Sequence, residues 1–349
     1  MSISKKSFGT TSKGEEVTLY TIENKNGMKA EFIDFGAILV NLYVADKDGK
    51  FDDVVLGYDN IESYEKLNVP GFGSFIGRHA NRIGDAKFEL NGTTYELEKN
   101  DGPNNLHGGT PGYNKVMYEA ATTENSISFH RVSPDGEQGF PGNFDVTMTY
   151  TLTDENEVVL TYEGTSDKDT IVNLTNHSYF NLAGHKSGKI LDHKVIIKSN
   201  AFTPTNDNLI PMGEVMEVAG TPMDFRNLKR IGDEIDADFK PIQIAGGYDH
   251  NYILDREDNG EVVYVAELVE ETSGRKMEVY TDLVGMQFYT GNFIDNESGK
   301  EGAHYTKRDG VCFETQFFPN SINVPSFKSC ALKAGETFKS VTKYAFKTV

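Results

Sequence analysis

The chain has 349 residues, which is enough for one large domain or two ordinary ones. Its 34 Lys and Arg against 53 Asp and Glu leave a formal net charge of −19. An acidic surface repels nucleic-acid phosphates and anionic lipid headgroups, so we expect neither nucleic acid nor a membrane as a partner. The first residues lack the apolar core of a signal peptide, and two cysteines are too few for a disulfide framework. These features predict a cytoplasmic protein.

Short segments of alternating apolar and polar residues, separated by turn dipeptides, run through the whole chain. They predict antiparallel strands joined as hairpins, and the 34 glycines agree with a fold that turns this often. Helical periodicity is confined to 60–67 and 231–237, each long enough for a turn or two. The predicted hairpins join 17–22 to 28–35 across Asn26-Gly27, 38–44 to 54–58 across Asp48-Gly49 and 87–90 to 93–97 across Asn91-Gly92, with further pairs flanking 154–156, Asn259-Gly260 and Ser273-Gly274.

No linker, low-complexity tract or fixed-period repeat divides the chain. Many strands in a long chain without a boundary predict an all-β fold. We expect one large antiparallel β-sandwich, a single domain over residues 1–349, with its functional groups along a concave face.

The segment 173–184 organises the functional prediction. Strand alternation places Thr175, His177 and Tyr179 on one face, which sets a titratable imidazole beside an aromatic ring. That combination suits a sugar, because its C–H faces stack on aromatic rings while its hydroxyl groups need polar partners. Taken alone, the segment fits equally a core histidine hydrogen-bonded to a neighbouring strand, which is the commoner arrangement.

Three polar, glycine-rich loops add candidate residues. The loop 73–84 contains Asn81 and Arg82, which can act together only if a bulge or turn brings them to one side. The loop 99–109 contains His107, and 246–251 contains Asp249. The alternatives are a surface ion pair for Arg82, a solvated His107 and a turn-forming Asp249.

The strand predicted at 311–317 has an apolar face, which leaves Glu314 on the opposite face. A carboxyl group beside a bulky aromatic wall loses water, which raises its pKa and makes it a better base, although such a face is more often simply exposed to solvent. Gln287 and Tyr289 share a face of another predicted strand in the same way.

Two patterns are dismissed. The segment 184–189 looks like a phosphate-binding loop but is one residue short and lacks the following Ser or Thr. His185 and His193 have no helix to bring them onto one metal ion, so no zinc site is predicted.

Eight segments stand out in chain order: GRHANRIG (77–84), NNLHGG (104–109), SPDGEQGFPGN (133–143), TNHSYFNLAG (175–184), TPMDFR (221–226), GYDHN (247–251), QFYTGN (287–292) and FETQ (313–316). Together they resemble the galactose mutarotase (aldose 1-epimerase) family over nearly the whole chain. The resemblance implies the galactose mutarotase-like supersandwich and free aldohexoses, such as galactose and glucose, as substrates. It also implies that no cofactor takes part. We further expect no metal ion, and a protein that is a monomer or a homodimer.

Carried over to this sequence, the resemblance implies that His177 is the general acid and Glu314 the general base. The sugar-binding positions it implies are Asn81, Arg82, His107, Tyr179, Asp249 and Gln287. The family often has a Trp near the position of Tyr118, and after Gln316 commonly a His and then Pro-Asp, where this chain has Phe317 and then Pro319-Asn320.

These residues suit the interconversion of sugar anomers. The anomeric hydroxyl must lose a proton while the ring oxygen gains one, and each assisted transfer contributes about 10²–10⁴ in rate. The active form then needs His177 protonated and Glu314 ionised, and we expect a neighbouring carboxylate such as Asp249 to raise the pKa of His177.

Three other functions stay open. A glycoside hydrolase would use Asp249 and Glu314 as its two carboxylates across a scissile bond. A relative acting on hexose 6-phosphates would need further Arg or Lys at the far end of the pocket. A sugar-binding module without catalysis would keep the aromatic rings but would not need both His177 and Glu314.

Overall fold

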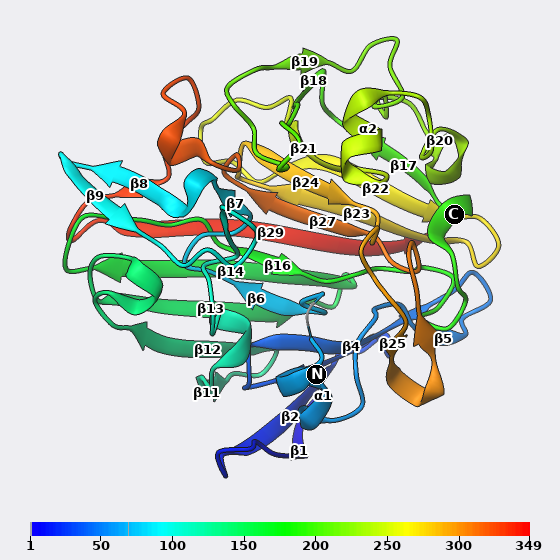
Figure 1. Ribbon diagram of the computed structural model, residues 1–349. Coiled ribbons are helices and arrows are strands. Elements are labelled where there is room, and N and C mark those ends of the chain that lie inside the picture. The colour runs from blue at the N-terminus through cyan, green and yellow to red at the C-terminus, as the bar shows by residue number, and fades with distance from the viewer. Residues whose placement is uncertain (1, 69) are drawn as a thin grey trace.

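The computed structural model of the chain describes residues 2–68 and 70–349. Strands dominate, and among the described residues the only α-helices are α1 (Ile61–Lys66) and α2 (Lys240–Ala245). The strands of the three main sheets pair antiparallel. The predicted all-β, antiparallel fold is therefore confirmed (Figure 1).

One layer of the fold is a nine-stranded sheet in which the last strand of the chain is central, because β29 pairs with β14 on one side and β23 on the other. Its strands alternate buried and exposed residues, as expected for a sheet with one face on a core. In sheet order the strands are β11 (Glu119–Thr122), β12 (Ser126–Ser133), β13 (Phe144–Leu152), β14 (Glu157–Ser166), β29 (Thr337–Thr348), β23 (Arg275–Thr281), β22 (Val263–Glu270), β17 (Lys194–Ile197) and β20 (Lys229–Arg230).

The second layer consists of two five-stranded sheets with the β6–β16 pair between them, since β6 contacts β4 and β16 contacts β27. The N-terminal sheet contains β1 (Ser2–Thr10), β2 (Glu16–Glu23), β3 (Lys29–Ile33), β4 (Ile38–Ala45) and β5 (Phe51–Asp53). The joining pair is β6 (Ser74–Ile76) and β16 (Thr175–His177). The other sheet, called the site sheet below, contains β19 (Met216–Glu217), β18 (Ala201–Thr203), β21 (Asp249–Ile253), β24 (Gly285–Tyr289) and β27 (Cys312–Gln316).

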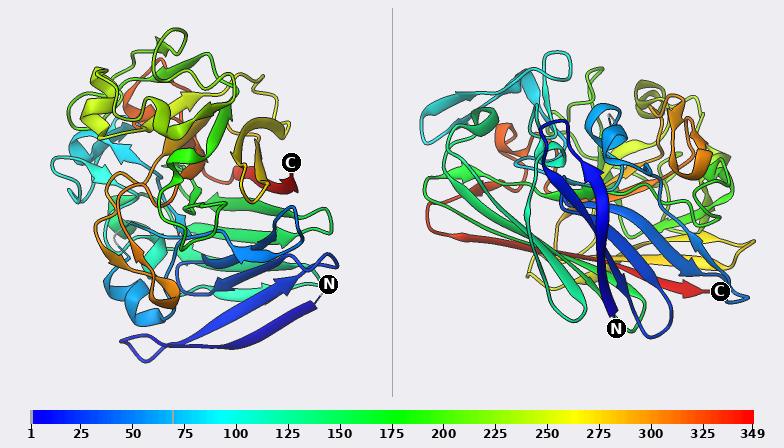
Figure 2. Two further views of the ribbon diagram at one scale, coloured as in Figure 1. Left: turned by 90° about the vertical axis from the view of Figure 1, so that its right-hand side faces the viewer. Right: turned by 90° about the horizontal axis from the view of Figure 1, so that it is seen from below.

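The main core fills the space between the two layers. Phe129 and Tyr162 of the large sheet share it with Ile22 of the N-terminal sheet and with Phe288 and Phe313 of the site sheet. Burying one side chain of this size contributes about 1.5–3 kcal/mol, so the core holds the layers face to face. Figure 2 shows the N-terminal strands, in blue, against the large sheet.

Four short strand pairs complete the fold on the rims of the two layers. They are β7 (Arg82–Ile83) with β10 (Asn105–Leu106), β8 (Lys87–Leu90) with β9 (Thr93–Glu96), β15 (Thr170–Ile171) with β28 (Ala331–Leu332), and β25 (Glu297–Ser298) with β26 (His304–Tyr305).

The predicted hairpins are confirmed at β2–β3, β8–β9, β13–β14 and β22–β23. The turn at Asp48-Gly49 joins β4 to Phe51–Asp53 instead of to 54–58. The prediction of a hairpin at Asn259-Gly260 is wrong. The strand before this dipeptide, β21, pairs with β18 and β24, whereas the strand after it, β22, pairs with β17 and β23. A turn dipeptide fixes only local geometry, and here its two flanks belong to different layers.

The helix predicted at 60–67 is confirmed as α1, where the Asn60 side chain caps the first turn by accepting from the Ser63 amide. The segment 231–237 forms only a single 3₁₀ turn, Ile231–Asp233. Prediction missed α2, although Pro241 near its start and a left-handed Gly246 at its end are typical helix boundary signals. Within the described residues, no helix combines the length and apolarity needed to cross a bilayer.

A buried ion pair ties the β25–β26 segment to the N-terminal sheet. The ammonium group of Lys300 contacts the Asp53 carboxylate, and the two side chains are only 2% and 7% exposed. Lys300 Nζ also donates to the carbonyl of Val40 at 2.6 Å and to Asn41 Oδ1 at 2.8 Å. All three ammonium hydrogens therefore have acceptors, which is the condition for burying a lysine.

We expect Lys300→Met to destabilise the protein by about 3–5 kcal/mol in urea unfolding, because it leaves the Asp53 charge buried without its cation. The matched control is Lys66→Met, which removes an exposed pair with Glu62 and should leave stability nearly unchanged. Equal stability of the two variants would show that the buried pair does not hold this segment.

Candidate active site

Strand register in the site sheet brings distant residues onto one face. Asp249 of β21 lies opposite Tyr289 of β24, and Gln287 of β24 lies opposite Glu314 of β27. Positions two apart on a strand share a face, so all four side chains project from the same side of the sheet. The sequence assigns Glu314 to the face opposite Phe313, and the structure agrees, since Phe313 packs in the main core.

His177 reaches this face from β16, which contacts β27. Its Nε2 lies 3.6 Å from Glu314 Oε1, and the side chains are 7% and 2% exposed. Tyr179 stacks on the imidazole with ring centroids 5.0 Å apart, and its hydroxyl donates to the carbonyl of Pro70 at 2.9 Å. The predicted neighbours on 173–184 thus form one wall, with the imidazole held between an aromatic ring and a carboxyl group.

Asn81 and His107 are held together by two hydrogen bonds. The backbone N–H of Asn81 donates to His107 Nδ1 at 3.2 Å, and the backbone N–H of His107 donates to the backbone carbonyl of Asn81 at 3.1 Å. Both residues have left-handed backbone, with φ of 62° and 52°. This conformation is the turn that joint action of Asn81 and Arg82 requires. The His107 ring lies 5.3 Å from that of His177, between centroids.

Arg82 enters the site beside Asp101, whose carboxylate accepts from Arg82 Nε at 2.7 Å. The guanidinium charge also acts on Asp249 and Glu314, favouring the ionised form of each. Prediction missed Asp101, because a turn-type Asp in a loop gives no signal of which cation it will meet. Asp249 Oδ1 in turn accepts from Gln287 Nε2 at 2.6 Å.

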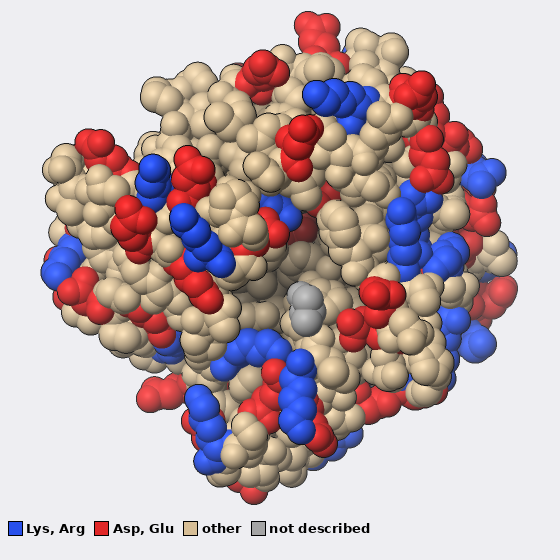
Figure 3. Space-filling view, in the orientation of Figure 1, with Lys and Arg blue, Asp and Glu red and all other residues tan. Residues whose placement is uncertain are grey.

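The wall that carries both imidazoles borders a pocket of about 500 Å³, a volume in the range of small-molecule sites. Its lining includes His107, His177, Gly71 and Lys115. Lys115 Nζ donates to the carbonyls of Tyr64 and Glu65, at 2.7 Å each. Figure 3 shows a hollow at the centre of this face, in the region where Figure 1 shows β6, β16 and β27.

Burial controls the protonation of the central pair. It lowers the pKa of His177 to about 4 and raises the pKa of Glu314 well above its ordinary value, the latter reinforced by Asp249 and opposed by Arg82. The expected rise in the pKa of His177 is therefore wrong, because loss of water around the imidazole dominates. The expected rise for Glu314 is confirmed. One proton shared by the pair thus resides on Glu314.

His107, His177 and Glu314 offer ligand atoms within 4.8 Å of one another, which is close enough to hold a metal ion. The hydrogen bond from Asn81 makes His107 Nδ1 an acceptor, so in the neutral ring Nε2 carries the proton. Burial keeps that ring neutral by lowering its pKa well below the ordinary value. His107 is therefore arranged to donate a hydrogen bond, which suits a sugar oxygen better than a cation.

Cys312 is a further neighbour that sequence reasoning missed. Its Sγ lies 3.6 Å from His177 Nδ1, on the side of the imidazole away from Glu314, and burial raises the pKa of the thiol well above its ordinary value. A proton on Nδ1 directed at this sulfur leaves Nε2 free to accept the proton of Glu314. The period-two spacing of Cys312 and Glu314 on β27 was the available signal.

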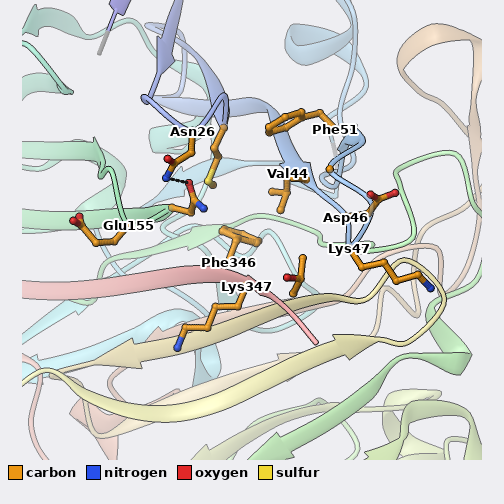
Figure 4. Close-up of a pocket in the computed structure, with 13 residues that line it drawn as sticks. Asn26, Val44, Asp46, Lys47, Phe51, Glu155, Phe346 and Lys347 are labelled. Atoms are coloured by element: carbon orange, nitrogen blue, oxygen red, sulfur yellow. Dashed lines mark hydrogen bonds between the residues drawn. The ribbon is translucent and has the colours of Figure 1, made fainter.

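A separate pocket of about 490 Å³ lies where the N-terminal sheet meets the end of β29 (Figure 4). Its lining includes two aromatic residues, Phe51 and Phe346, and two lysines, Lys47 and Lys347. None of its lining residues is a histidine. It therefore lacks the imidazoles that line the first pocket.

A family model described as Aldose 1-epimerase matches residues 18–345. The chain is 42% identical over 347 residues to galactose mutarotase from Sus scrofa, covering 99% of each chain. It is 35% identical over 336 residues to aldose 1-epimerase from Escherichia coli K12, covering 95% of this chain and 96% of the relative.

Two solved structures share the fold. An aldose epimerase homologue from C. elegans has a TM-score of 0.88 at 29% identity, covering 95% of this chain and 99% of the other. Galactose 1-epimerase from Lactobacillus acidophilus NCFM has a TM-score of 0.86 at 26% identity, covering 99% of each chain. The sequence match, the shared fold and the site geometry agree, and the chain belongs to the aldose 1-epimerase family.

Proposed function

We propose that this epimerase-type isomerase interconverts the α and β anomers of free aldohexoses, with His177 as general acid and Glu314 as general base. The observation that carries the assignment of roles is the 3.6 Å approach of His177 Nε2 to Glu314 Oε1 between two buried side chains. An acid and a base at that spacing can serve the two oxygens bonded to one anomeric carbon.

The reaction balances without any group beyond the sugar and this pair. Glu314 takes the proton of the anomeric hydroxyl while His177 Nε2 gives one to the ring oxygen, and the bond between C1 and the ring oxygen breaks. The open aldehyde rotates about C1–C2. On closure the former ring oxygen attacks the other face of C1, returning its proton to His177, and the new anomeric oxygen takes a proton from Glu314. The enzyme ends in the state in which it began.

The pair needs one proton between its members, wherever that proton starts. Burial places it on Glu314, and a shift to His177 gives the imidazolium and carboxylate that begin the reaction. The charge of Arg82 favours the carboxylate and so lowers the cost of this shift. Arg82 is held in place for this by its bond to Asp101.

The remaining predicted residues fit roles in holding the sugar. His107 donates from Nε2, and Asn81 fixes the direction of that ring. Asp249 accepts from sugar hydroxyl groups and Gln287 orients its carboxylate. Tyr179 offers its ring beside the imidazole. Holding the ring in register with the pair raises the fraction of productive encounters.

The other functions have weaker support. Lys115 lines the pocket, as a hexose 6-phosphate would require, but its ammonium group is bound to two backbone carbonyls. A hydrolase would use Asp249 as its second carboxylate, yet Gln287 already binds one oxygen of that group. A binding module gives no reason for a buried imidazole beside a buried carboxyl group.

The proposal also covers the domain organisation, oligomeric state and cellular compartment of the protein. We infer one domain over residues 1–349, acting as a monomer or a homodimer in the cytoplasm. Both cysteines, Cys312 and Cys330, are free, which agrees with a reducing compartment.

The direct test is polarimetry of freshly dissolved α-galactose and α-glucose with the purified protein. We expect equilibration faster than the spontaneous reaction measured in the same buffer. An absence of excess rate with both sugars would contradict the proposed function, and release of sugar from a glycoside would favour the hydrolase.

We expect Glu314→Gln to lower kcat by about 10²–10⁴-fold, because the amide keeps size and hydrogen bonding but cannot take a proton. His177→Asn should have a similar effect at the other proton. The matched control is Glu278→Gln, a buried glutamate on β23 of the large sheet, which should keep normal kcat. A near-normal excess rate in folded Glu314→Gln would rule out this residue as the base.

We expect a bell-shaped dependence of kcat/KM on pH, with limbs that follow the shifted pKa values. On the acid side the pair gains a second proton as pH falls toward the His177 pKa of about 4. On the alkaline side it loses its only proton as pH rises through the raised pKa of Glu314. Rates are measured as the excess over spontaneous mutarotation at each pH. An alkaline limb near pH 4.5, the ordinary pKa of a Glu side chain, would contradict the assignment of this limb to a Glu314 with a raised pKa.

A further inference from the structure

A chain of buried amide groups lies on the site face of β24 and β27 and ends at Asp249. Gln316, which is fully buried, donates from Nε2 to Gln287 Oε1 and to Asn251 Oδ1, both at 3.2 Å. Gln287 Nε2 then donates to Asp249 Oδ1 at 2.6 Å. Asn251 Nδ2 reaches Thr203 Oγ1 at 3.4 Å. The three amides thus connect the interior of the site sheet to a predicted sugar-binding carboxylate.

The direction of each hydrogen bond in this chain is fixed by the carboxylate. An ionised Asp249 can only accept, so Gln287 must turn its NH₂ group toward it and its oxygen away. That oxygen then needs a donor, and Gln316 supplies one of its two N–H groups while the other binds Asn251. If Gln287 turned over, its oxygen would face the carboxylate, which is repulsive.

The backbone leaves room for the chain at Gly285. This residue pairs with Gln316 across β24 and β27. A Cβ atom at Gly285 would lie 2.6 Å from Asn251 Oδ1 and 2.8 Å from the Phe318 ring, both closer than van der Waals contact. A side chain here would displace Asn251 from its place beside Gln316, so the lack of one is part of the arrangement.

We propose that Gln316 is a positioning residue, which fixes the amide of Gln287 so that Asp249 is held as an acceptor with its second oxygen directed to a sugar hydroxyl group. Gln316 itself does not contact the sugar. The bond from Gln287 favours the ionised form of Asp249, against a burial that raises the pKa of this carboxyl group. This inference rests on the proposed function, in which Asp249 holds the sugar ring.

The role predicts a distinct kinetic signature. Gln316 follows Glu314 on the same face of β27, yet its contacts lead away from Glu314, through Gln287, to Asp249. Its loss should therefore weaken sugar binding more than it affects proton transfer. We expect Gln316→Met to raise KM by about tenfold while kcat changes by less than about threefold, the loss expected for one misdirected hydrogen bond to a charged group.

The experiment is a double-mutant cycle with Gln316→Met and Asp249→Asn, measured as KM and kcat by polarimetry. If Gln316 acts through Asp249, the double variant should have nearly the KM of Asp249→Asn alone. The matched control is Tyr344→Phe, which removes a buried hydrogen bond to the carbonyl of Phe313 on the same strand, β27. The control should lower thermal stability and leave KM unchanged.

A second variant, Gln316→Leu, fills nearly the same volume and has neither donor nor acceptor. It should leave Gln287 Oε1 without its donor and raise KM as Gln316→Met does. Additive effects in the cycle, or an unchanged KM in either variant, would overturn the inference. In that case normal activity of the wild type and a raised KM in Asp249→Asn would leave the proposed function intact.

Discussion

The site depends on one physical constraint, the removal of water from a carboxyl group and an imidazole that lie 3.6 Å apart. In water, Glu314 would be ionised and His177 partly protonated, and the two would titrate almost independently. Burial lowers the pKa of His177 and raises that of Glu314, so that the pair retains one proton at pH values between the two. A reaction that moves one proton off the sugar and one onto it needs this stored proton at every turnover.

The surrounding fold keeps that constraint by anchoring the loops that cover the pair. Arg78, only 1% exposed, donates to the carbonyls of Ser133 and Pro141, and so fixes the start of the loop that carries Asn81. Asn320 supports the other end of this loop, since its backbone N–H donates to the carbonyl of Arg82. This is one of the positions where the chain departs from the family pattern. The bond to Arg82 comes from the backbone, which an Asp would keep, so the departure changes the side-chain bond from Asn320 Nδ2 to the carbonyl of Pro211 and not the acid–base pair.

How much the sequence could predict depended on the range of the interaction. Alternation along β27 was enough to place Glu314 opposite the core, and the dipeptide Asn91-Gly92 was enough for its hairpin. The pairing of distant strands could not be predicted in this way. No local pattern shows that Gln287 lies opposite Glu314, or that the strands on the two sides of Asn259-Gly260 belong to different sheets. The segments that resemble a known family supplied those residues without their geometry.

The direction of the pKa shift shows a second limit of sequence reasoning. A carboxylate such as Asp249 near an imidazole suggests a raised pKa, but that effect holds only if water still surrounds the ring. In the fold, Tyr179 and Cys312 occupy two sides of His177, and the cost of burying a charge lowers the pKa of the imidazole. Burial is a property of the assembled layers, so the order in which the two groups titrate emerges only when β16 and β27 are in contact.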